Sequence, residues 1–303
     1  MDVLVFGAGS LGSLVGGLLA RAHDVTLVGR DPHVETVRQD GLRITGVESL
    51  DVHPAATTDA TGASADLAVV TVKAYDTEVA ARTLATGEYG AVCSLQNGMG
   101  NEDVLAARVD APVVAGAATC GARLAEPGHV EWLGRGTATL GAWRPNSDGA
   151  TVNRVAEAFR DAGLPTEVTT DVRRRLWEKL AVNAAINPVT ALARVENGAL
   201  TTGPLAEVAT AAAEETAAVA RADGVDISSA TATDAVTAVA NETARNRSSM
   251  RRDVERGRRT EIDAINGYVV GRADAVGTSA PTNRTLAALV RGWETGAGVR
   301  EEG

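Results

Sequence analysis

The stretch "LWEKLAVNAAINP" carries a lysine and two asparagines at a spacing that could serve chemistry. Lys179, Asn183 and Asn187 recur every fourth residue, so in a helix they share one face. The residues between them are all apolar, and this polar stripe is therefore not expected to face bulk water. A buried ammonium and two buried amides need hydrogen-bond partners. The spacing alone leaves two hypotheses open: a bound ligand supplies those partners, or another domain of the chain does.

A second candidate site lies at the N-terminus, in "VLVFGAGSLGSLVGGLLA". Gly7, Gly9 and Gly12 form a G-x-G-x-x-G pattern that follows a strand-like run and opens a helical one. In such loops the first glycine permits a tight turn, the second lets the backbone approach a pyrophosphate, and the third allows close helix–strand packing. The helix N-terminus then faces the phosphates with free N–H groups. The pattern predicts a dinucleotide site; the alternative is a glycine-rich turn without a ligand.

The residue that ends the second strand-like run bears on the choice of dinucleotide. This run reads "TLVGR", so Arg30 stands where NAD-binding proteins usually carry an acidic residue. A guanidinium suits the 2′-phosphate of NADP through a bidentate, charge-assisted pair. In an arginine-rich chain it could also be a solvated surface residue, and the neighbouring Asp31 weakens the signal. We expect NADP (NADPH) as the cofactor.

The elements that must position these residues change character along the chain. Short valine-rich runs read as buried strands at 2–6, 24–28, 66–72, 91–95 and 112–119. Amphipathic helical segments, for example 77–84 and 102–109, lie between them. Further strands are predicted at 128–134 and 137–143, and a helix near 148–162. This alternation predicts an α/β domain with a parallel sheet and helices on both faces.

Strand signals stop after residue 171, and alanine-rich helical sequence continues almost to the end. We expect a nucleotide-binding domain over 1–169 and an all-helical substrate or catalytic domain over 170–303. No long linker joins them, so we expect the two domains to pack together with the active site in the interdomain cleft.

Composition excludes several classes of protein. The net charge of −10 and pI of about 5.0 argue against nucleic-acid binding through a positive field. Cys93 and Cys120 stand alone, so neither a metal site nor a disulfide framework is predicted. No basic leader and no long apolar run are present, and we expect a cytoplasmic protein that does not contact a membrane.

Six pieces of sequence occur in a specific order and spacing over nearly the whole chain: "GAGSLG", "TVKAYDT", "LQNGMGNED", "KLAVNAAINPVTAL", "ENG" and "SSMRRDVERGRRTEID". In these pieces the chain resembles the 2-dehydropantoate 2-reductase (ketopantoate reductase) family. Its members reduce 2-dehydropantoate to D-pantoate with NADPH, on the route to pantothenate and coenzyme A. Their fold is a Rossmann-type domain followed by an all-helical domain. The resemblance implies an NADP-dependent oxidoreductase of a small 2-keto acid, with a homodimer left open.

The resemblance also implies roles for single residues. Lys179 matches the proton donor, and Glu261 matches a position that is both catalytic and cofactor-binding. Substrate contacts are implied for Lys179, Asn183, Asn187, Asn197, Asn246, Ser248 and Ser249. Cofactor contacts are implied for Gly7, Ala8, Gly9, Ser10, Leu11, Gly12, Arg30, Lys73, Asn97, Ala122 and Glu261.

Both lysines of the chain, against 27 arginines, fall on these implied positions. Reduction of a 2-keto group produces an alkoxide, which a cationic acid both stabilises and protonates. Arginine is a poor proton donor, whereas a desolvated lysine can shift towards its neutral form. Lys73 could instead be a surface cation, and Asn97 a turn former in "LQNGMG". Glu261 could orient the ammonium or contact the nicotinamide ribose.

The chain departs from the family at "SSMRRD", where many members read "SSMLQD". Arg251 and Arg252 would add positive charge near an anionic substrate if they reached the cleft; one or both are more simply expected to point to solvent.

Two other functions compete with ketopantoate reduction. A reductase of a different 2-keto acid would need the same glycine loop and lysine. The added amides and hydroxyl favour a hydroxylated substrate, because a polar site discriminates against molecules that lack its partner. A non-catalytic NADP-sensing protein would not need a proton donor.

Overall fold

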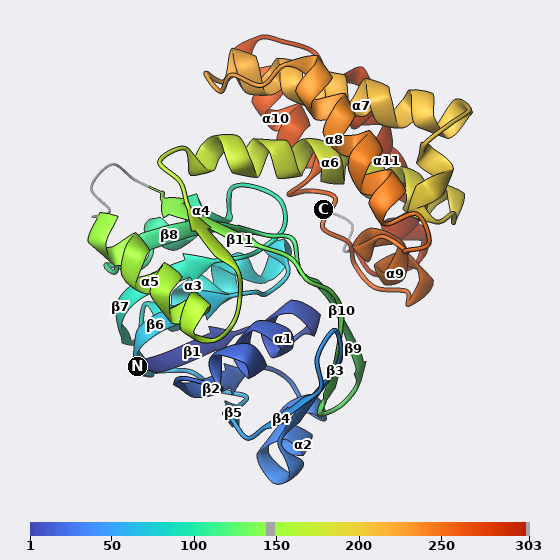
Figure 1. Ribbon diagram of the computed structural model, residues 1–303. Helices are drawn as coiled ribbons and strands as arrows, with labels where there is room; N and C mark the ends of the chain where they lie inside the picture. Colours follow the sequence, from blue (N-terminus) through green and yellow to red (C-terminus); the bar gives the residue numbers. More distant parts are fainter. Residues whose placement is uncertain (144–148, 301–303) are drawn as a thin grey trace. The chain divides into compact units, whose positions relative to one another are not determined.

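The structure is a computed structural model that describes residues 1–143 and 149–300 (Figure 1). The chain divides into two compact units. The first unit comprises Met1–Gln96 and Asn101–Val172, and the second comprises Asn97–Gly100 and Arg173–Gly303. Residue 148, where the sequence predicts the start of a helix, lies outside the described residues.

The described part of the first unit is built on an eight-stranded sheet with the order β5-β2-β1-β6-β7-β8-β11-β12. The strands are β1 (Asp2–Phe6), β2 (Asp24–Val28), β5 (Ala55–Thr57), β6 (Ser64–Val70), β7 (Glu88–Ser94), β8 (Val113–Ala118), β11 (Ala138–Ala142) and β12 (Thr166–Val168). All neighbours pair in parallel except β8 and β11. From β5 to β8 this is the strand order of a Rossmann fold, which reverses between β1 and β6.

Helices cover both faces of this sheet, as the alternation of strands and helices predicts. Val3 and Val5 point to one face and join the core under α1 (Ser10–Leu19) and α5 (Gly149–Asp161). Leu4 points to the other face, under α3 (Thr77–Leu84) and α4 (Asn101–Ala106). Because side chains alternate along a strand, β1 contributes to both cores. The predicted α/β class is confirmed, and the predicted strands agree with the observed ones within three residues.

A second, smaller sheet has the order β4-β3-β10-β9, and of its strands only the one at 128–134 was predicted from the sequence. Its strands are β4 (Leu50–Val52), β3 (Leu42–Gly46), β10 (His129–Gly134) and β9 (Gly121–Glu126). The parallel pair β3 and β10 joins residues more than eighty positions apart, for example Arg43 and His129. A pairing of such distant segments leaves no local pattern in the sequence.

A buried histidine, His33, joins this small sheet to helix α1 of the larger one. His33 begins α2 (His33–Asp40), and its Nε2 lies 2.9 Å from the Ser13 hydroxyl of α1. The backbone N–H of Gly128, in the turn between β9 and β10, donates to His33 Nδ1 at 3.0 Å. Burial lowers the pKa of His33 below its ordinary value of 6.5. A neutral imidazole serves both contacts, because Nδ1 must accept.

The described part of the second unit is helical, as predicted. Its elements are α6 (Val172–Ala193, which begins in the first unit), η2 (Asn197–Leu200), α7 (Pro204–Ala222), α8 (Ser229–Glu242), α9 (Ser249–Glu255), α10 (Asn266–Val276) and α11 (Pro281–Gly296). Residues 176–191 of α6 are all buried or half-buried, so α6 is the central helix of this unit. Within residues 1–143 and 149–300, no helix combines the length and apolarity that a membrane crossing needs.

A proline inside α6 explains one buried polar contact of this unit. Pro188 has no N–H and so cannot bond the carbonyl of Ala184 one turn earlier. Asn266, the first residue of α10, donates from Nδ2 to that carbonyl at 3.0 Å. Asn266 also donates to Asn283 Oδ1 at 3.0 Å, and Asn283 in turn bonds Glu215 at 2.9 Å. These side chains therefore join α6, which carries the polar stripe, to α7, α10 and α11.

Candidate active site

The three glycines of the N-terminal loop occupy different kinds of space. Gly7 follows β1 with φ +114°, a conformation that other residues rarely adopt, and an added Cβ would lie 2.6 Å from Val72 N. A Cβ on Gly12 would overlap the Gly7 carbonyl and the Thr71 hydroxyl. Gly9 is different, because the nearest atom to an added Cβ is Gly7 O at 4.0 Å. Only the middle glycine therefore leaves room for a ligand against the backbone.

The loop leads directly into the N-terminus of α1. The N–H of Ser13 is the first in α1 to bond back along the chain, to Gly9 O at 2.9 Å. The N–H groups before it have no partner within the helix, which is the arrangement that binds phosphate. The Ser10 hydroxyl accepts from Leu124 N–H of β9 at 3.0 Å. Ala122, two residues earlier on β9, points to the same side of that strand as Leu124.

Thr71, which follows β6, contacts the glycine loop that follows β1. These two strands are neighbours at the point where the strand order reverses. Phe6 of β1 pairs with Val70 of β6, so the residues that follow them meet at one edge of the sheet. The Thr71 hydroxyl donates to Gly7 O at 2.9 Å. Lys73 comes two residues later, half-buried and at the start of the short helix η1 (Ala74–Asp76). Lys73 thus lies at the carboxyl edge where Rossmann sheets bind ligands.

Arg30 is exposed, with 88% of its side chain accessible. Its Nη2 lies 3.2 Å from Asp76 Oδ2, at the end of η1. The neighbouring Asp31, by contrast, accepts from Glu35 N–H of α2 at 3.1 Å. The Asp31 carboxylate thus satisfies one of the N–H groups that the first turn of α2 leaves unpaired.

In the second unit, α6 carries Lys179, Asn183 and Asn187 on one face, as the spacing predicts. Lys179 and Asn183 are half-buried and Asn187 is buried. Asn183 Nδ2 is buried without a hydrogen-bond partner among the described residues. Leaving such a group unsatisfied costs about 1–3 kcal/mol. This amide is the strongest indication that α6 faces a ligand.

Asn197 brings a second element to this group of residues. It begins η2, is buried, and donates from Nδ2 to the Thr243 hydroxyl at 2.9 Å. Its backbone N–H donates to Asn246 O at 3.0 Å, so Asn197 and Asn246 lie side by side. Asn197 Oδ1 is buried and, within residues 1–143 and 149–300, accepts no hydrogen bond. It adds an unsatisfied acceptor to the unsatisfied donor of Asn183.

The two predicted serines have different environments. Ser248 is buried and caps α9, accepting from Arg251 N–H at 3.1 Å. Its Oγ lies 2.7 Å from the hydroxyl of Thr190, which stands three residues after Asn187 on α6. Ser249 is exposed as the first residue of α9. Ser248 is thus joined to the polar face of α6, whereas no described contact joins Ser249 to it.

Of the two neighbouring arginines, of which one or both were expected to point to solvent, Arg251 does not do so. Arg251 is buried, and its Nε donates to Glu255 Oε1 at 2.8 Å, one turn along α9. Its Nη1 is buried and finds no partner in the described parts of the chain. Arg252 is only half-buried. The aliphatic part of arginine can occupy an apolar position while the charged end reaches a partner, which a charge pattern does not reveal.

Asn97 and Glu261 are brought near each other through a backbone contact within the second unit. Asn97 is followed by Gly98 (φ +79°), and Met99 N–H donates to Ala264 O at 3.0 Å. Glu261 is buried three residues before Ala264, in the turn that leads into α10. A side chain at Gly98 would lie 2.6 Å from Ala264 O. Glycine is therefore required at position 98 for the Asn97 loop to pack against the turn that carries Glu261.

Comparison with known proteins identifies the class to which these two sites belong. The family model "Ketopantoate reductase PanE/ApbA" matches residues 3–145, and "Ketopantoate reductase PanE/ApbA C terminal" matches residues 171–294. The chain therefore belongs to the ketopantoate reductase family, and the predicted resemblance is confirmed. It is an enzyme family of oxidoreductases that use a nicotinamide cofactor.

Individual relatives agree with this assignment. The 2-dehydropantoate 2-reductase of Halobacterium salinarum is 46% identical over 96% of this chain and 98% of its own. A PanE/ApbA family ketopantoate reductase from Ralstonia eutropha is 37% identical, with a TM-score of 0.89 over 98% of this chain and 100% of its own. A D-mandelate dehydrogenase solved with NADH and anilino(oxo)acetate has a TM-score of 0.93 over 99% of this chain and 100% of its own. Its identity is 23%, so this last likeness concerns the fold alone.

Several residues that build the two sites were not singled out in the sequence. Thr71 and Asp76 support the glycine loop and Arg30, and Thr190 and Asn266 support α6. Thr190 continues the polar stripe after Asn187, so the helical spacing could have revealed it. Asp76 and Asn266 contact partners far away in the chain, and a single sequence carries no signal of such contacts.

Proposed function

We propose that this chain reduces 2-dehydropantoate to D-pantoate with NADPH, with Lys179 as the proton donor. The observation that carries the proposal is the polar face of α6, where Lys179 is followed by Asn183, whose buried Nδ2 has no partner within residues 1–143 and 149–300. A ligand with oxygen acceptors would satisfy that amide. Family membership supports a 2-keto acid as this ligand.

The glycine loop fits a dinucleotide. Space at Gly9 is open, the N-terminus of α1 offers free N–H groups, and Gly7 and Gly12 keep the turn close to Thr71. Residues 7–12 would hold the pyrophosphate, with Lys73, Asn97, Ala122 and Glu261 as further cofactor contacts. When bound, NADPH supplies a hydride to the 2-keto carbon.

The chain's own residues handle the oxygen on that carbon. The Lys179 ammonium stabilises the developing alkoxide and passes it the proton from Nζ. Asn183, Asn187 and Asn197 orient the substrate through their amides. Ser248, held by Thr190, and its neighbours Asn246 and Ser249 complete the proposed substrate contacts. Glu261 acts on the ammonium or on the ribose of the cofactor.

NADPH is favoured over NADH by the charges at the end of β2. Arg30 is exposed, so a 2′-phosphate can reach it, and Asp31 is engaged at the start of α2. The ion pair between Arg30 and Asp76 is a surface pair, worth about 0–1 kcal/mol, so a phosphate can replace it at low cost.

A second candidate function is the reduction of a different 2-keto acid. Arg251 favours it. Many family members read "SSMLQD" and carry a leucine at this position, whereas here Arg251 has a buried Nη1 without a partner among the described residues. Such a group would favour another anionic substrate. A non-catalytic NADP sensor has no comparable observation in its support.

The test is an assay of NADPH oxidation with a panel of 2-keto acids at equal concentration. We expect kcat/KM to be highest for 2-dehydropantoate, by at least about tenfold, because each polar contact discriminates against substrates without its partner. A higher value for a keto acid without the hydroxyl would favour the second candidate. Binding of NADPH without turnover of any keto acid would favour the sensor.

A further inference from the structure

The turn that carries Glu261 is fastened on one side to a buried carboxylate. Thr260 donates twice to Glu294 Oε1 of α11, from its backbone N–H and from its hydroxyl, both at 2.7 Å. Glu294 is completely buried. The N–H of Ile262 donates to the Thr260 hydroxyl oxygen at 3.2 Å. The residues immediately before and after Glu261 are therefore both held by the same group of contacts.

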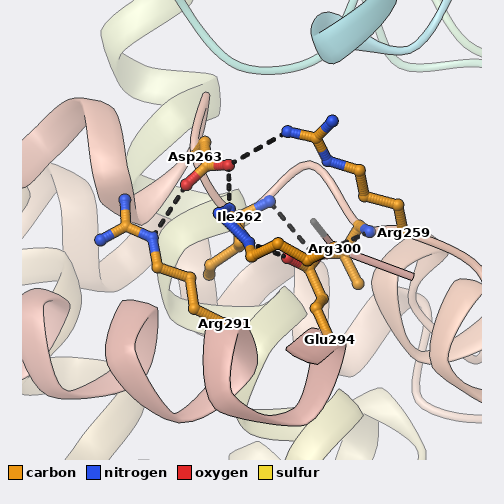
Figure 2. A network of polar contacts seen from close by, with 7 residues as sticks. Arg259, Ile262, Asp263, Arg291, Glu294 and Arg300 are labelled. Atoms are coloured by element: carbon orange, nitrogen blue, oxygen red, sulfur yellow. Dashed lines mark hydrogen bonds and ion pairs between the residues drawn. The ribbon is translucent and has the colours of Figure 1, made fainter. Parts of the chain in front are cut away.

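The other side of the turn is fastened by arginines (Figure 2). Asp263 Oδ1 lies 2.8 Å from Arg291 Nε of α11, and its Oδ2 lies 3.6 Å from Arg259 Nη2. Arg300 contacts Asp263 Oδ2 through Nη2 and lies 2.9 Å from Glu294 Oε2 through Nε. Arg300 thus contacts both Glu294, which accepts from Thr260, and Asp263, which belongs to the turn itself.

Such a network is a costly way to gain stability. Moving a carboxylate from water into the protein interior costs several kcal/mol, and buried ion pairs often stabilise less than apolar residues of the same size. A network of this kind can instead define one conformation, because the contacts of Thr260, Glu294 and Arg300 are made together in one geometry. What it defines here is the backbone on both sides of Glu261.

The same turn sets the position of Asn97. Met99 bonds Ala264, the residue directly after Asp263, and Gly98 fits there only because it has no side chain. Two proposed site residues from distant parts of the sequence therefore depend on one short segment.

We propose that Glu294 and Arg300 are positioning residues that hold Glu261, and with it Asn97, in the geometry that catalysis requires. This inference rests on the proposed function, in which Glu261 acts on Lys179 or on the cofactor. Neither Glu294 nor Arg300 touches substrate in this account. They act through the backbone of residues 260–264.

The first test is a double-mutant cycle. Arg300→Ala and Glu294→Gln are each measured in the wild-type and Glu261→Ala backgrounds, with NADPH and 2-dehydropantoate. Glutamine keeps an acceptor for Thr260 but turns an N–H donor towards Arg300. We expect each to lower kcat by about 10–100-fold in the wild-type background, the scale of a small displacement in an active site. In the Glu261→Ala background we expect less than about a twofold further loss, because coupled residues are not additive.

The second test reads the turn itself, without activity. Amide hydrogen exchange of Thr260 and Ile262 should become about tenfold or more faster in Glu294→Gln, since local opening exposes these N–H groups. Arg284→Ala is the matched control: it removes an ion pair of the same helix, with Asp274 at 2.6 Å, away from the turn. This control should change neither kcat nor exchange at Thr260. If Glu294→Gln does not fold, Asp263→Asn replaces it in both tests, because Asp263 is partly exposed.

The inference is overturned if Arg300→Ala lowers kcat equally in both backgrounds, or in neither, while wild-type enzyme reduces 2-dehydropantoate. Faster exchange with unchanged kcat would likewise overturn it, because the network would then serve stability alone. Failure of the proposed function gives a different result: wild-type enzyme itself would not turn over 2-dehydropantoate.

Discussion

The proposed ligand site of the first unit is built mainly from backbone, and that of the second unit mainly from side chains. In the first, the glycine loop offers N–H groups and open space at Gly9, and its exposed Arg30 contributes one charge. In the second, α6 presents Lys179 and asparagine amides from a helix that is buried or half-buried over residues 176–191. Backbone N–H groups suit a cofactor that many enzymes share, whereas side chains provide the acid and the selectivity of one reaction.

The difference predicts how each unit responds to substitution. A change in the glycine loop acts through volume, since an added Cβ either overlaps a neighbour or takes space from the ligand. A change on the face of α6 acts through chemistry, since it removes a charge or an amide from a helix that remains folded. The experiments on Lys179 and on the glycine loop below separate these responses.

The largest expected effect is that of Lys179→Ala on turnover. We expect kcat to fall by about 10²–10⁴-fold, the usual contribution of general acid catalysis, with little change in the Kd of NADPH. Arg175→Ala is the control on the same helix, because Arg175 is half exposed and pairs with Glu178 at 2.9 Å. Turnover of Lys179→Ala close to that of the control would remove Lys179 as the proton donor.

Alanine at two positions of the glycine loop should separate folding from binding. Gly12→Ala forces a Cβ into the Gly7 carbonyl and should destabilise the protein by about 1–3 kcal/mol, visible as a lower Tm. Gly9→Ala meets only Gly7 O at 4.0 Å, so its Tm should stay near that of the wild type. Its Kd for NADPH should rise by about tenfold, or about 1.4 kcal/mol. Unchanged cofactor binding in Gly9→Ala would contradict the backbone site.

Charge at the end of β2 should decide between the two cofactors. Arg30→Ala should weaken NADPH binding by about 1.5–3 kcal/mol, the scale of hydrogen bonds to charged groups, and hardly affect NADH. Asp76→Asn should do the opposite and tighten NADPH by about two- to fivefold, since it frees Arg30 from a surface ion pair. Titration of both cofactors by fluorescence measures these changes. Equal preference for NADH and NADPH in the wild type would count against Arg30.

The smallest effect concerns pH and His33. Burial lowers its pKa, so the unfolded chain binds a proton at a higher pH than the folded protein does. The stability this gives is present above the ordinary value of 6.5 and is lost as pH falls from there through the lowered pKa. His33→Gln should reduce the loss of Tm between about pH 7.5 and pH 5.5. An identical pH dependence of Tm in both proteins would show that His33 does not contribute to the pH dependence of stability.

Local patterns in the sequence predict much of the fold. The runs at 2–6, 24–28 and 77–84 coincide with β1, β2 and α3, because alternating or helical periodicity is a property of each segment alone. The sheet of β3, β4, β9 and β10 was missed, although β10 was predicted as a strand at 128–134. Its two hairpins, β3–β4 and β9–β10, are joined through the parallel pair β3 and β10, whose segments lie far apart in the chain.

The residues of the candidate site also fall into two groups, those predicted from local spacing and those that were missed. The face shared by Lys179, Asn183 and Asn187 follows from helical spacing and was predicted. The Asn266 contact with the carbonyl freed by Pro188, and the contact of Thr260 with Glu294, depend on tertiary packing. Residue types that do chemistry are thus visible in the sequence, whereas the residues that hold them in place are not.

The most direct test of the central claim is the turnover of Lys179→Arg, measured together with binding of 2-dehydropantoate in the presence of NADP⁺ by calorimetry. Arginine keeps the positive charge that stabilises an alkoxide but does not readily give up a proton. We expect kcat to fall by about 10²-fold or more while the Kd of the keto acid changes far less. A Lys179→Arg enzyme that kept most of its kcat would show that charge alone suffices and would contradict lysine as the acid.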